Sequence, residues 1–573
     1  MTTEIESFQL PIFYLEDKIK LEEHLITDLE LKQSENNKSL YEHIFNPGKI
    51  NFAQKTIPLW SEYYTANTNY IRDSQKLITK KKLPIIDINN DYKKINEIWN
   101  EIQTETSFEE KYQYLDWKFL APLNNNAKFL QCMSLYNMTS PIISLTLPIF
   151  LLIFPFFLLK LQGISITIPT YIDVLKRVFQ RHQLGQIFSV GSASWEKRIY
   201  ILVTFIFYIV QVYQNIMSCI RFGTNMKKLH EQIFTIRDYA TETIERMETL
   251  ELCCEKLPTY KPFIEEMLNK KYILTVMRDD FNLVTENKFS FKKIFQTGHL
   301  LKCFYQLYNR QPYHEALMYS FGFNGYLHNL TMFKKSIRAG HISKCKLSKN
   351  KTKFKNAYFP TLLEQNPVKN SYNLDKHILI TGPNAAGKTT ILKTTIFNIL
   401  FSQQIGFGFY DSASIAPFDQ IHCYINIPDT SGRDSLFQAE ARRCKNILTE
   451  IENSQISNNN ARYFCVFDEL YSGTNPYEAI GSATSYLRYL NNNKNITYMI
   501  TTHFLDLCHR LDKDNTVVNC HMKINIEGDD FNYIYKMDKG ISDIKGGVKV
   551  LRDLEYPEEI ILATKEIIND LVI

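Results

Sequence analysis

The feature that most constrains this chain is the segment HILITGPNAAGKTTILKTTIFNIL, which begins at His377. An apolar run leads into the pattern G-x-x-x-x-G-K-[ST], formed by Gly382, Gly387, Lys388 and Thr389, and a helical pattern follows it. Two glycines let backbone N–H groups wrap around phosphates, and the N-terminus of the following helix adds its positive dipole. The segment therefore predicts a strand, a phosphate-binding loop and a helix in that order.

This loop predicts a nucleotide site. Lys388 is expected to reach the β and γ phosphates, and Thr389 to offer its hydroxyl to magnesium. ATP and Mg²⁺ are therefore the expected cofactors. The residues of this segment expected to bind the nucleotide are Gly382, Pro383, Asn384, Gly387, Lys388, Thr389 and Thr390.

Two later apolar runs end in polar residues that suit phosphoryl transfer. The run ARYFCVFDEL ends in Asp468 and Glu469, and NITYMITTH ends in His503. Asp468 is expected to hold magnesium through its water shell, and Glu469 to orient the attacking water. His503 is placed to sense or bond the γ-phosphate. Ligands of open α/β sheets bind at the carboxyl ends of the strands, which favours this interpretation over a solvated turn.

The N-terminal half contains two long apolar stretches. Pro141 to Leu159 and Ile199 to Ile220 carry no formal charge, and each is about long enough to cross the hydrocarbon core of a bilayer. They predict two membrane segments within residues 136–222. Buried core helices of a soluble protein are the alternative.

The loop between the two stretches is basic. Its cationic residues are Lys176, Arg177, Arg181, Lys197 and Arg198. A short loop this basic resists translocation across a membrane. A hairpin that dips in from the cytosolic face, or one crossing with one re-entrant segment, is therefore an alternative to two full crossings.

The expected fold class is α + α/β, with a helical region and two membrane helices followed by a P-loop domain in which helices flank a mixed sheet. Lysines recur from Lys344 to Lys355 with one aromatic among them, which is typical of a solvated linker. The expected regions are 1–135 (helical), 136–222 (membrane segments), 223–343 (helical lever), 344–356 (linker) and 357–573 (ATPase).

Composition excludes several classes of protein. With 45% hydrophobic and 13% aromatic residues the chain is neither disordered nor fibrous. A formal charge of +5 over 573 residues is too weak to predict nucleic-acid binding by itself. Eleven cysteines without a CxxC pair predict neither a disulfide framework nor a structural metal site, and they fit an intracellular compartment. The N-terminus lacks the pattern of a secretory signal.

Over about residues 357–573 the motifs resemble those of the MutS family of the ABC ATPase class, and they occur in family order. TGPNAAGKTT resembles the family loop TGPNMGGKST, FDELYSGTNPYEAIGSA its Walker B segment, and TTHF its histidine switch. The segment GRDSLFQAEARRCKNIL is similar to the family's ST-F-x-x-E-M signature, with Ser435, Phe437 and Glu440 in the matching places. The segment from YKMDKG to PEEII resembles the C-terminal end of the family.

The resemblance implies an ATPase that works as a composite dimer, in which Ser435 binds the nucleotide of the opposite subunit. A homodimer is therefore the expected assembly. The expected catalytic residues are Lys388, Glu469 and His503, and the expected metal-binding residues are Thr389 and Asp468. DNA is a further candidate partner, without mismatch specificity, and the membrane is another. The expected location is intracellular and membrane-associated, with the ATPase domain in the cytosol.

The resemblance also has limits. Residues 28–65 resemble the start of the family's helical core only faintly, and the mismatch-reading and connector domains that precede that core are expected to be absent. Ala385 and Ala386 stand where the family has Met-Gly. The spacing of the family's mismatch wedge is matched only by Phe108, Glu109 and Glu110, which we interpret as chance. Candidates for an aromatic platform under adenine are Tyr358, Phe359 and Tyr535.

Two other functions fit the same residues. The first is a soluble MutS-like DNA repair or recombination factor whose apolar stretches are buried in its core. The second is a scaffold protein with a vestigial site, although every phosphate-binding, magnesium-binding and water-activating position is filled. Hydrolysis of ATP as a conformational switch is the preferred hypothesis.

Overall fold

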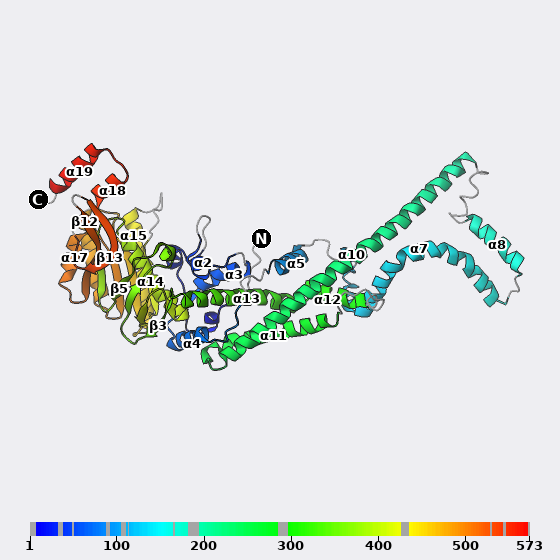
Figure 1. The fold of residues 1–573 in the computed structure, drawn as a ribbon, viewed down its shortest axis with the longest axis horizontal. Coiled ribbons are helices and arrows are strands. Elements are labelled where there is room, and N and C mark those ends of the chain that lie inside the picture. The colour runs from blue at the N-terminus through cyan, green and yellow to red at the C-terminus, as the bar shows by residue number, and fades with distance from the viewer. Residues whose placement is uncertain are drawn as a thin grey trace. The chain divides into compact units, whose positions relative to one another are not determined.

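The computed structural model describes residues 7–570 apart from 33–37, 49–50, 87–91, 105–110, 113, 164–166, 182–193, 285–295, 426–434, 528–529 and 543–545. The chain divides into two compact units, one of residues 1–91, 246–270 and 318–573 and one of residues 92–245 and 271–317. Helices predominate, and the larger sheets are mixed (Figure 1). The predicted α + α/β class is confirmed at this level.

A six-stranded sheet forms the centre of the C-terminal part of the first unit. Its strand order is β13-β12-β6-β11-β10-β9, with only the β12–β13 pair antiparallel. The inner strands are almost entirely buried, as is usual for parallel strands covered on both faces. The strands are β6 (His377–Thr381), β9 (Gln420–Tyr424), β10 (Tyr463–Asp468), β11 (Ile496–Thr501), β12 (Val517–Glu527) and β13 (Asp530–Lys539).

The register of this sheet sets the position of the strand ends. Asp468 of β10 lies opposite Thr501 of β11, and Thr501 lies opposite Ile380 of β6. Because these strands run parallel, their carboxyl ends meet at one edge of the sheet. The glycine-rich loop follows β6 at this edge.

A second sheet corrects one prediction. Residues 344–356, expected to be a solvated linker, contain most of β3 (Ser343–Leu347) and most of β4 (Lys353–Ala357). The buried side chains of Cys345 and Phe354 alternate with exposed lysines, which is the pattern of a half-buried strand. The sheet has the order β5-β4-β8-β3-β7, and its other strands are β5 (Asn370–Asn373), β7 (Phe407–Gly408) and β8 (Ser412–Ile415).

Helix α14 (Lys388–Ile405) links the N-terminal region to the sheets. It is buried on nearly every side, so its polar side chains need partners within the protein. Gln404 Nε2 donates to the Trp60 carbonyl at 2.7 Å, and Tyr41 Oη donates to Gln404 Oε1 at 2.7 Å. Gln403 Nε2 donates to the Phe418 carbonyl at 2.8 Å. The helix that starts at the glycine-rich loop is thus bonded directly to residues near the N-terminus.

The N-terminal region of the first unit is built from short elements, including a two-stranded sheet of β1 and β2. These elements are η1 (Pro11–Tyr14), β1 (Lys18–Lys20), α1 (Glu23–Asp28), α2 (Leu40–Phe45), α3 (Asn51–Thr56), η2 (Ile57–Ser61), β2 (Tyr63–Thr65) and α4 (Thr68–Thr79). The remaining elements of this unit are η5 (Pro258–Tyr260), η7 (Pro360–Gln365), α15 (Leu436–Ser457), α16 (Pro476–Asn491), α17 (Leu505–Asp512), α18 (Gly547–Asp553) and α19 (Glu558–Asp570).

The second unit contains helices and no strand among its described residues. Gly298 of α12 lies against α7, where an added Cβ would come within 2.2 Å of the Ala127 carbonyl oxygen. Glu101 of α5 forms ion pairs with Lys111 and Lys228. The helices within it are α5 (Lys93–Thr104), η3 (Ala121–Asn125), α7 (Ala127–Leu161), α8 (Ile168–Arg181) and α12 (Thr297–Asn309). Three more helices have residues in both units: α10 (Trp195–Cys254), α11 (Lys261–Asn282) and α13 (Gln311–Arg338).

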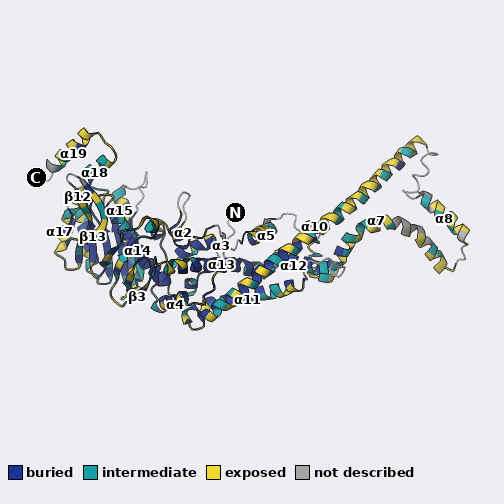
Figure 2. Cartoon of the chain, in the orientation of Figure 1, coloured by how far each residue is buried: buried dark blue, intermediate teal, exposed yellow. Residues whose placement is uncertain are grey.

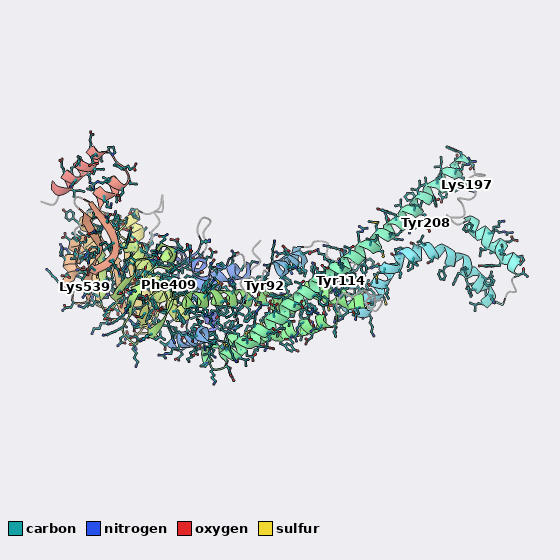
Figure 3. All side chains as sticks on the ribbon, viewed as in Figure 1. Tyr92, Tyr114, Lys197, Tyr208, Phe409 and Lys539 are labelled. Atoms are coloured by element: carbon teal, nitrogen blue, oxygen red, sulfur yellow. The ribbon has the colours of Figure 1, made fainter. Side chains whose placement is uncertain are left out.

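Both apolar stretches are helical. Residues 141–159 lie in α7 and residues 199–220 in α10, where exposed residues recur along the helix (Figure 2). Lys197 lies just before the apolar stretch of α10 and Tyr208 within it (Figure 3). Among the described residues, α10 alone meets the length and composition needed to cross a membrane, and 6% of its apolar window is buried. Two membrane segments therefore stay a prediction.

Candidate functional site

The glycine-rich loop, residues 382–387, connects β6 to α14 with a backbone that suits few residues. Gly382 has a φ of 150° and Gly387 a φ of 88°. An added Cβ would lie 3.1 Å from Met522 at the first position and 3.2 Å from Tyr535 at the second. Glycine therefore suits both positions, because a side chain would be strained and crowded there. Ala385 also adopts a left-handed conformation, with a φ of 61°.

Lys388, the first residue of α14, has a buried side chain at the mouth of the loop. Its Nζ donates to the Gly382 carbonyl at 3.0 Å and lies 2.8 Å from His503 Nε2 and 3.7 Å from Glu469 Oε1. Burial lowers the pKa of Lys388, while the Glu469 and Asp468 carboxylates oppose that shift. The side chain is placed where phosphate oxygens could replace its present contacts.

Asp468 at the end of β10 is held by two threonine hydroxyls. Thr389 Oγ1 donates to Asp468 Oδ2 at 2.7 Å, and Thr501 Oγ1 donates to Oδ1. Burial raises the pKa of Asp468, and these two hydrogen bonds oppose the rise. The Thr389 hydroxyl and the Asp468 carboxylate supply hard oxygen ligands next to each other, which is the chemistry that Mg²⁺ prefers.

Thr501 was not among the predicted site residues. Besides bonding Asp468, its hydroxyl accepts a hydrogen bond from the Glu469 backbone N–H at 3.2 Å. Its position was a partial indication of a role in the site, because Thr501 begins the TTH motif two residues before His503. Its contact with Asp468 depends on the register of β10 and β11, which the sequence alone does not give.

Glu469 and His503 form a second polar pair. Glu469 has a left-handed backbone, with a φ of 53°, and its Oε1 lies 2.9 Å from His503 Nε2. The hydrogen bond from His503 is the main cause that lowers the pKa of Glu469. The same nitrogen lies 2.8 Å from Lys388 Nζ, and it can either donate to Glu469 or accept from Lys388. A change of hydrogen-bond partner at His503 would thus change the contacts of both Glu469 and Lys388.

A cavity of about 610 Å³ opens beside the glycine-rich loop. This volume lies within the usual range for ligand pockets, about 300–1,000 Å³. The predicted site residues that line the cavity are Pro383, Asn384, Gly387, Lys388, Thr389, Thr390 and Glu469. Gly382, Asp468 and His503 do not line it but contact Lys388 or Thr389, which do.

All three candidate aromatic residues also line this cavity. Tyr358 is buried, and its hydroxyl donates to the His341 carbonyl at 2.6 Å. Tyr535 is 44% exposed, with its ring against Gly387, and its backbone carbonyl accepts a hydrogen bond from Asn370 Nδ2 at 3.0 Å. Tyr535 therefore presents more free ring surface than Tyr358.

Ser435 lies apart from this cavity, at the N-terminus of α15. It is exposed, caps the helix through a hydrogen bond from the Gln438 backbone N–H, and is not among the residues that line the cavity. The buried Glu440 fastens α15 to the loop after β10 by accepting hydrogen bonds from Ser472 and Gly473 at 3.0–3.1 Å. Within its own chain, Ser435 therefore does not join the predicted nucleotide-binding residues.

The remaining candidate residues are not part of the site. Phe108, Glu109 and Glu110, the match to a mismatch wedge, lie outside the described residues. Phe437 is partly buried and packs against Tyr471 of the core, with ring centroids 5.6 Å apart.

Comparison with known proteins matches the region that carries this site. Residues 378–572 match the family described as MutS domain V. The DNA mismatch repair protein MutS of Pelotomaculum thermopropionicum is 29% identical over 197 residues, which cover 34% of this chain and 22% of that protein. The DNA mismatch repair protein spellchecker 1 of Drosophila melanogaster is 26% identical over 210 residues, which cover 36% and 22%.

These matches span about a fifth of the length of the relatives. The residues that match MutS domain V include all but the first residue of β6, the glycine-rich loop, α14, α15 and the strands that end in Asp468 and Thr501. The resemblance recognised in the motifs is therefore confirmed for this region. Residues 378–572, about a third of the chain, thus match domain V of the MutS family.

Proposed function

We propose that this chain is a MutS-related ATPase, associated with a membrane, that uses ATP binding and hydrolysis in a composite dimer as a conformational switch. The observation that carries the proposal is the convergence of Lys388, Asp468, Glu469 and His503 beside a cavity that the glycine-rich loop lines. In mechanism, the backbone N–H groups of the loop and the N-terminus of α14 bind the β and γ phosphates. Lys388 exchanges its carbonyl and imidazole contacts for phosphate oxygens.

The Thr389 hydroxyl and the Asp468 carboxylate would hold Mg²⁺, which neutralises charge on the phosphate oxygens when it is bound. Glu469 orients the attacking water and takes up its proton, since the low pKa of its carboxyl keeps it ionised. His503 bonds Glu469 on one side and lies next to Lys388 on the other. It is therefore suited to report whether a γ-phosphate is present.

The dimer supplies the remaining part of the proposed site. Ser435 is exposed at the N-terminus of α15, where a hydroxyl and a helix dipole can meet the phosphates of a second copy. Glu440 ties the same helix to the loop that follows Asp468 and Glu469. A nucleotide held between two copies would thus act on both α15 and β10.

Mixing two inactive variants tests the composite site. Lys388→Ala removes the phosphate-binding amine, and Ser435→Asp keeps a helix cap while placing negative charge at the expected phosphate. Each variant alone should lose at least about 100-fold in ATP turnover, as removal of one transition-state contact commonly does. In a mixed dimer one site contains both lesions and the other none, so mixing should restore turnover.

Ser435→Thr, which keeps the hydroxyl, serves as the matched control and should retain turnover. If the two variants form mixed dimers but turnover is not restored, Ser435 does not act on the nucleotide of the opposite subunit. That result would contradict the composite dimer.

Exposed apolar side chains support the membrane part of the proposal. Ile206 and Phe207 of α10 are 58% and 69% exposed, and Phe150 and Phe154 of α7 are 67% and 58% exposed. A large apolar surface on a single chain needs a covering of lipid or protein. We expect the ATPase domain to face the cytosol.

A soluble DNA repair or recombination factor is the second candidate function. The relatives' names favour it, because both of those described are DNA mismatch repair proteins. In that case the apolar side chains of α10 would be covered by protein instead of lipid, and DNA binding should weaken steeply with salt. Retention of the full-length protein in membranes through an alkaline carbonate wash supports the first candidate, and release favours the second.

A further inference from the structure

We propose that Glu22, His422 and Glu450 form a binding site for one divalent transition-metal ion, for which Zn²⁺ is the best chemical match. One ligand atom from each residue lies within 4.8 Å of the other two. The three residues come from separate parts of the first unit: the N-cap of α1, strand β9 and helix α15. This site does not share a residue with the nucleotide site.

The spacing of the three side chains suits a small tetrahedral ion. His422 Nδ1 lies 2.9 Å from Glu22 Oε1 and 3.3 Å from Glu450 Oε2. In a tetrahedral shell with bonds of about 2.1 Å, neighbouring ligand atoms are about 3.4 Å apart. Both distances from His422 Nδ1 lie within about 0.5 Å of that value.

Two buried atoms of the cluster need a partner. His422 Nδ1 and Glu450 Oε2 have no partner of hydrogen-bond geometry among the described residues, and the His422 side chain is only 1% exposed. An unsatisfied buried polar atom costs about 1–3 kcal/mol. A metal ion between them would satisfy both atoms at once.

The contact made by the other ring nitrogen, Nε2, indicates that Nδ1 carries a lone pair. His422 Nε2 lies 3.3 Å from Gln420 Oε1, an acceptor, so Nε2 carries the hydrogen in that contact. Nδ1 of the neutral ring then directs its lone pair toward two carboxylates, an arrangement that becomes favourable once a proton or a metal ion is bound at Nδ1. Metal-binding histidines commonly donate their second N–H in this way.

The surroundings fit the same interpretation. Arg443 donates to Glu22 Oε2 at 3.1 Å and to the Cys423 carbonyl, which orients the Glu22 carboxylate so that Oε1 faces His422 Nδ1. Glu22 and Glu450 also line a cavity of about 540 Å³, from which water can supply a fourth ligand. A metal ion here would fasten α1 and α15 to β9, and α15 carries Ser435 at its N-terminus.

Titration of the full-length protein with Co²⁺, a spectroscopic substitute for Zn²⁺, tests the site. Each titration uses the Asp468→Asn background, which removes a carboxylate of the nucleotide site, after chelator treatment and dialysis. We expect one Co²⁺ per chain with the absorption of a tetrahedral complex. Glu450→Gln should weaken binding at least about tenfold, as loss of a ligand does. Glu450→His should preserve binding with an altered spectrum.

Glu450 is 43% exposed, so its substitution is expected to leave the fold intact, and circular dichroism checks this. Glu452→Gln, an exposed glutamate on the same helix, is the matched control and should bind Co²⁺ like the parent protein. If the parent protein binds no Co²⁺, or if folded Glu450→Gln binds it equally well, the metal site is refuted. The cluster would then be an ion pair around a protonated His422.

Discussion

The nucleotide site and the apolar stretch of α10 differ in where their side chains find partners. At the site, the hydroxyls of Thr389 and Thr501 both donate hydrogen bonds to Asp468 within a single chain. Along α10, large apolar side chains such as Ile206 and Phe207 are exposed. These polar contacts form within this chain, whereas the apolar side chains of α10 need lipid or another protein to cover them.

The two regions also depend on different interactions. Burying one exposed Ile or Phe contributes about 1.5–3 kcal/mol, so the apolar side chains of α10 together provide a strong drive for association. The site instead depends on hydrogen bonds to charged groups, each of which contributes about 1.5–3 kcal/mol when made correctly. Substitutions can therefore test each region without disturbing the other.

The largest expected effect concerns the apolar stretch. Asp at both Ile206 and Ile209 should abolish membrane retention, because each charge near the middle of a membrane helix costs about 3 kcal/mol. Both side chains are at least half exposed, so the fold of the chain should survive. The measurement is sedimentation with membranes after an alkaline carbonate wash.

Leu252→Asp is the matched control, since Leu252 is 73% exposed on the same helix outside the apolar stretch. It should leave membrane retention unchanged. Equal retention of all three proteins would show that α10 does not insert.

The next effect concerns the stability of the sheet that carries the site. His377 at the start of β6 stacks on Tyr498, and its Nδ1 accepts the Tyr498 backbone N–H at 3.2 Å. Burial lowers the pKa of His377 to about 4. As the pH falls below about 6.5, the unfolded chain takes up this proton before the folded chain does. Stability from His377 is therefore complete above that pH and is lost as the pH falls toward 4.

The free energy of unfolding should accordingly drop by about 2 kcal/mol between pH 7 and pH 5 on account of His377 alone. His377→Asn keeps an acceptor for the Tyr498 N–H but does not titrate. Urea denaturation of both proteins at the two pH values measures the difference. An identical drop in the variant would mean that His377 is not the titrating group.

The smallest effect concerns Thr501. Thr501→Val removes the hydroxyl that bonds Asp468 and the Glu469 backbone while it preserves the shape of the side chain. ATP turnover should fall about tenfold, which corresponds to the loss of one hydrogen bond to a charged group. Thr497→Val on the same strand should have no such effect. Equal turnover in both variants would remove Thr501 from the site.

Local patterns predicted much of the site. The strand, loop and helix around Lys388 and the strand ending at Asp468 follow from apolar runs and glycine spacing, and the structure contains them. Thr501 was missed because its contact depends on strand register. The linker prediction for residues 344–356 was wrong because the number of lysines hid the alternation with Cys345 and Phe354.

Other features were beyond local patterns altogether. Glu22 and His422 are 400 positions apart in the sequence, so no motif could bring them together. The apolar stretches were recognised by hydropathy, which does not distinguish a lipid covering from a protein covering. The first unit likewise combines three separate segments of the chain, which periodicity cannot reveal.

The most direct test of the central claim is ATP turnover by the full-length protein and by Glu469→Gln, measured together with nucleotide binding. The proposed mechanism predicts that the variant binds ATP as tightly as the parent protein but hydrolyses it at least about 100-fold more slowly, since only the water-orienting base is lost. Equal turnover in the two proteins, or no turnover in the parent protein, would contradict hydrolysis at this site.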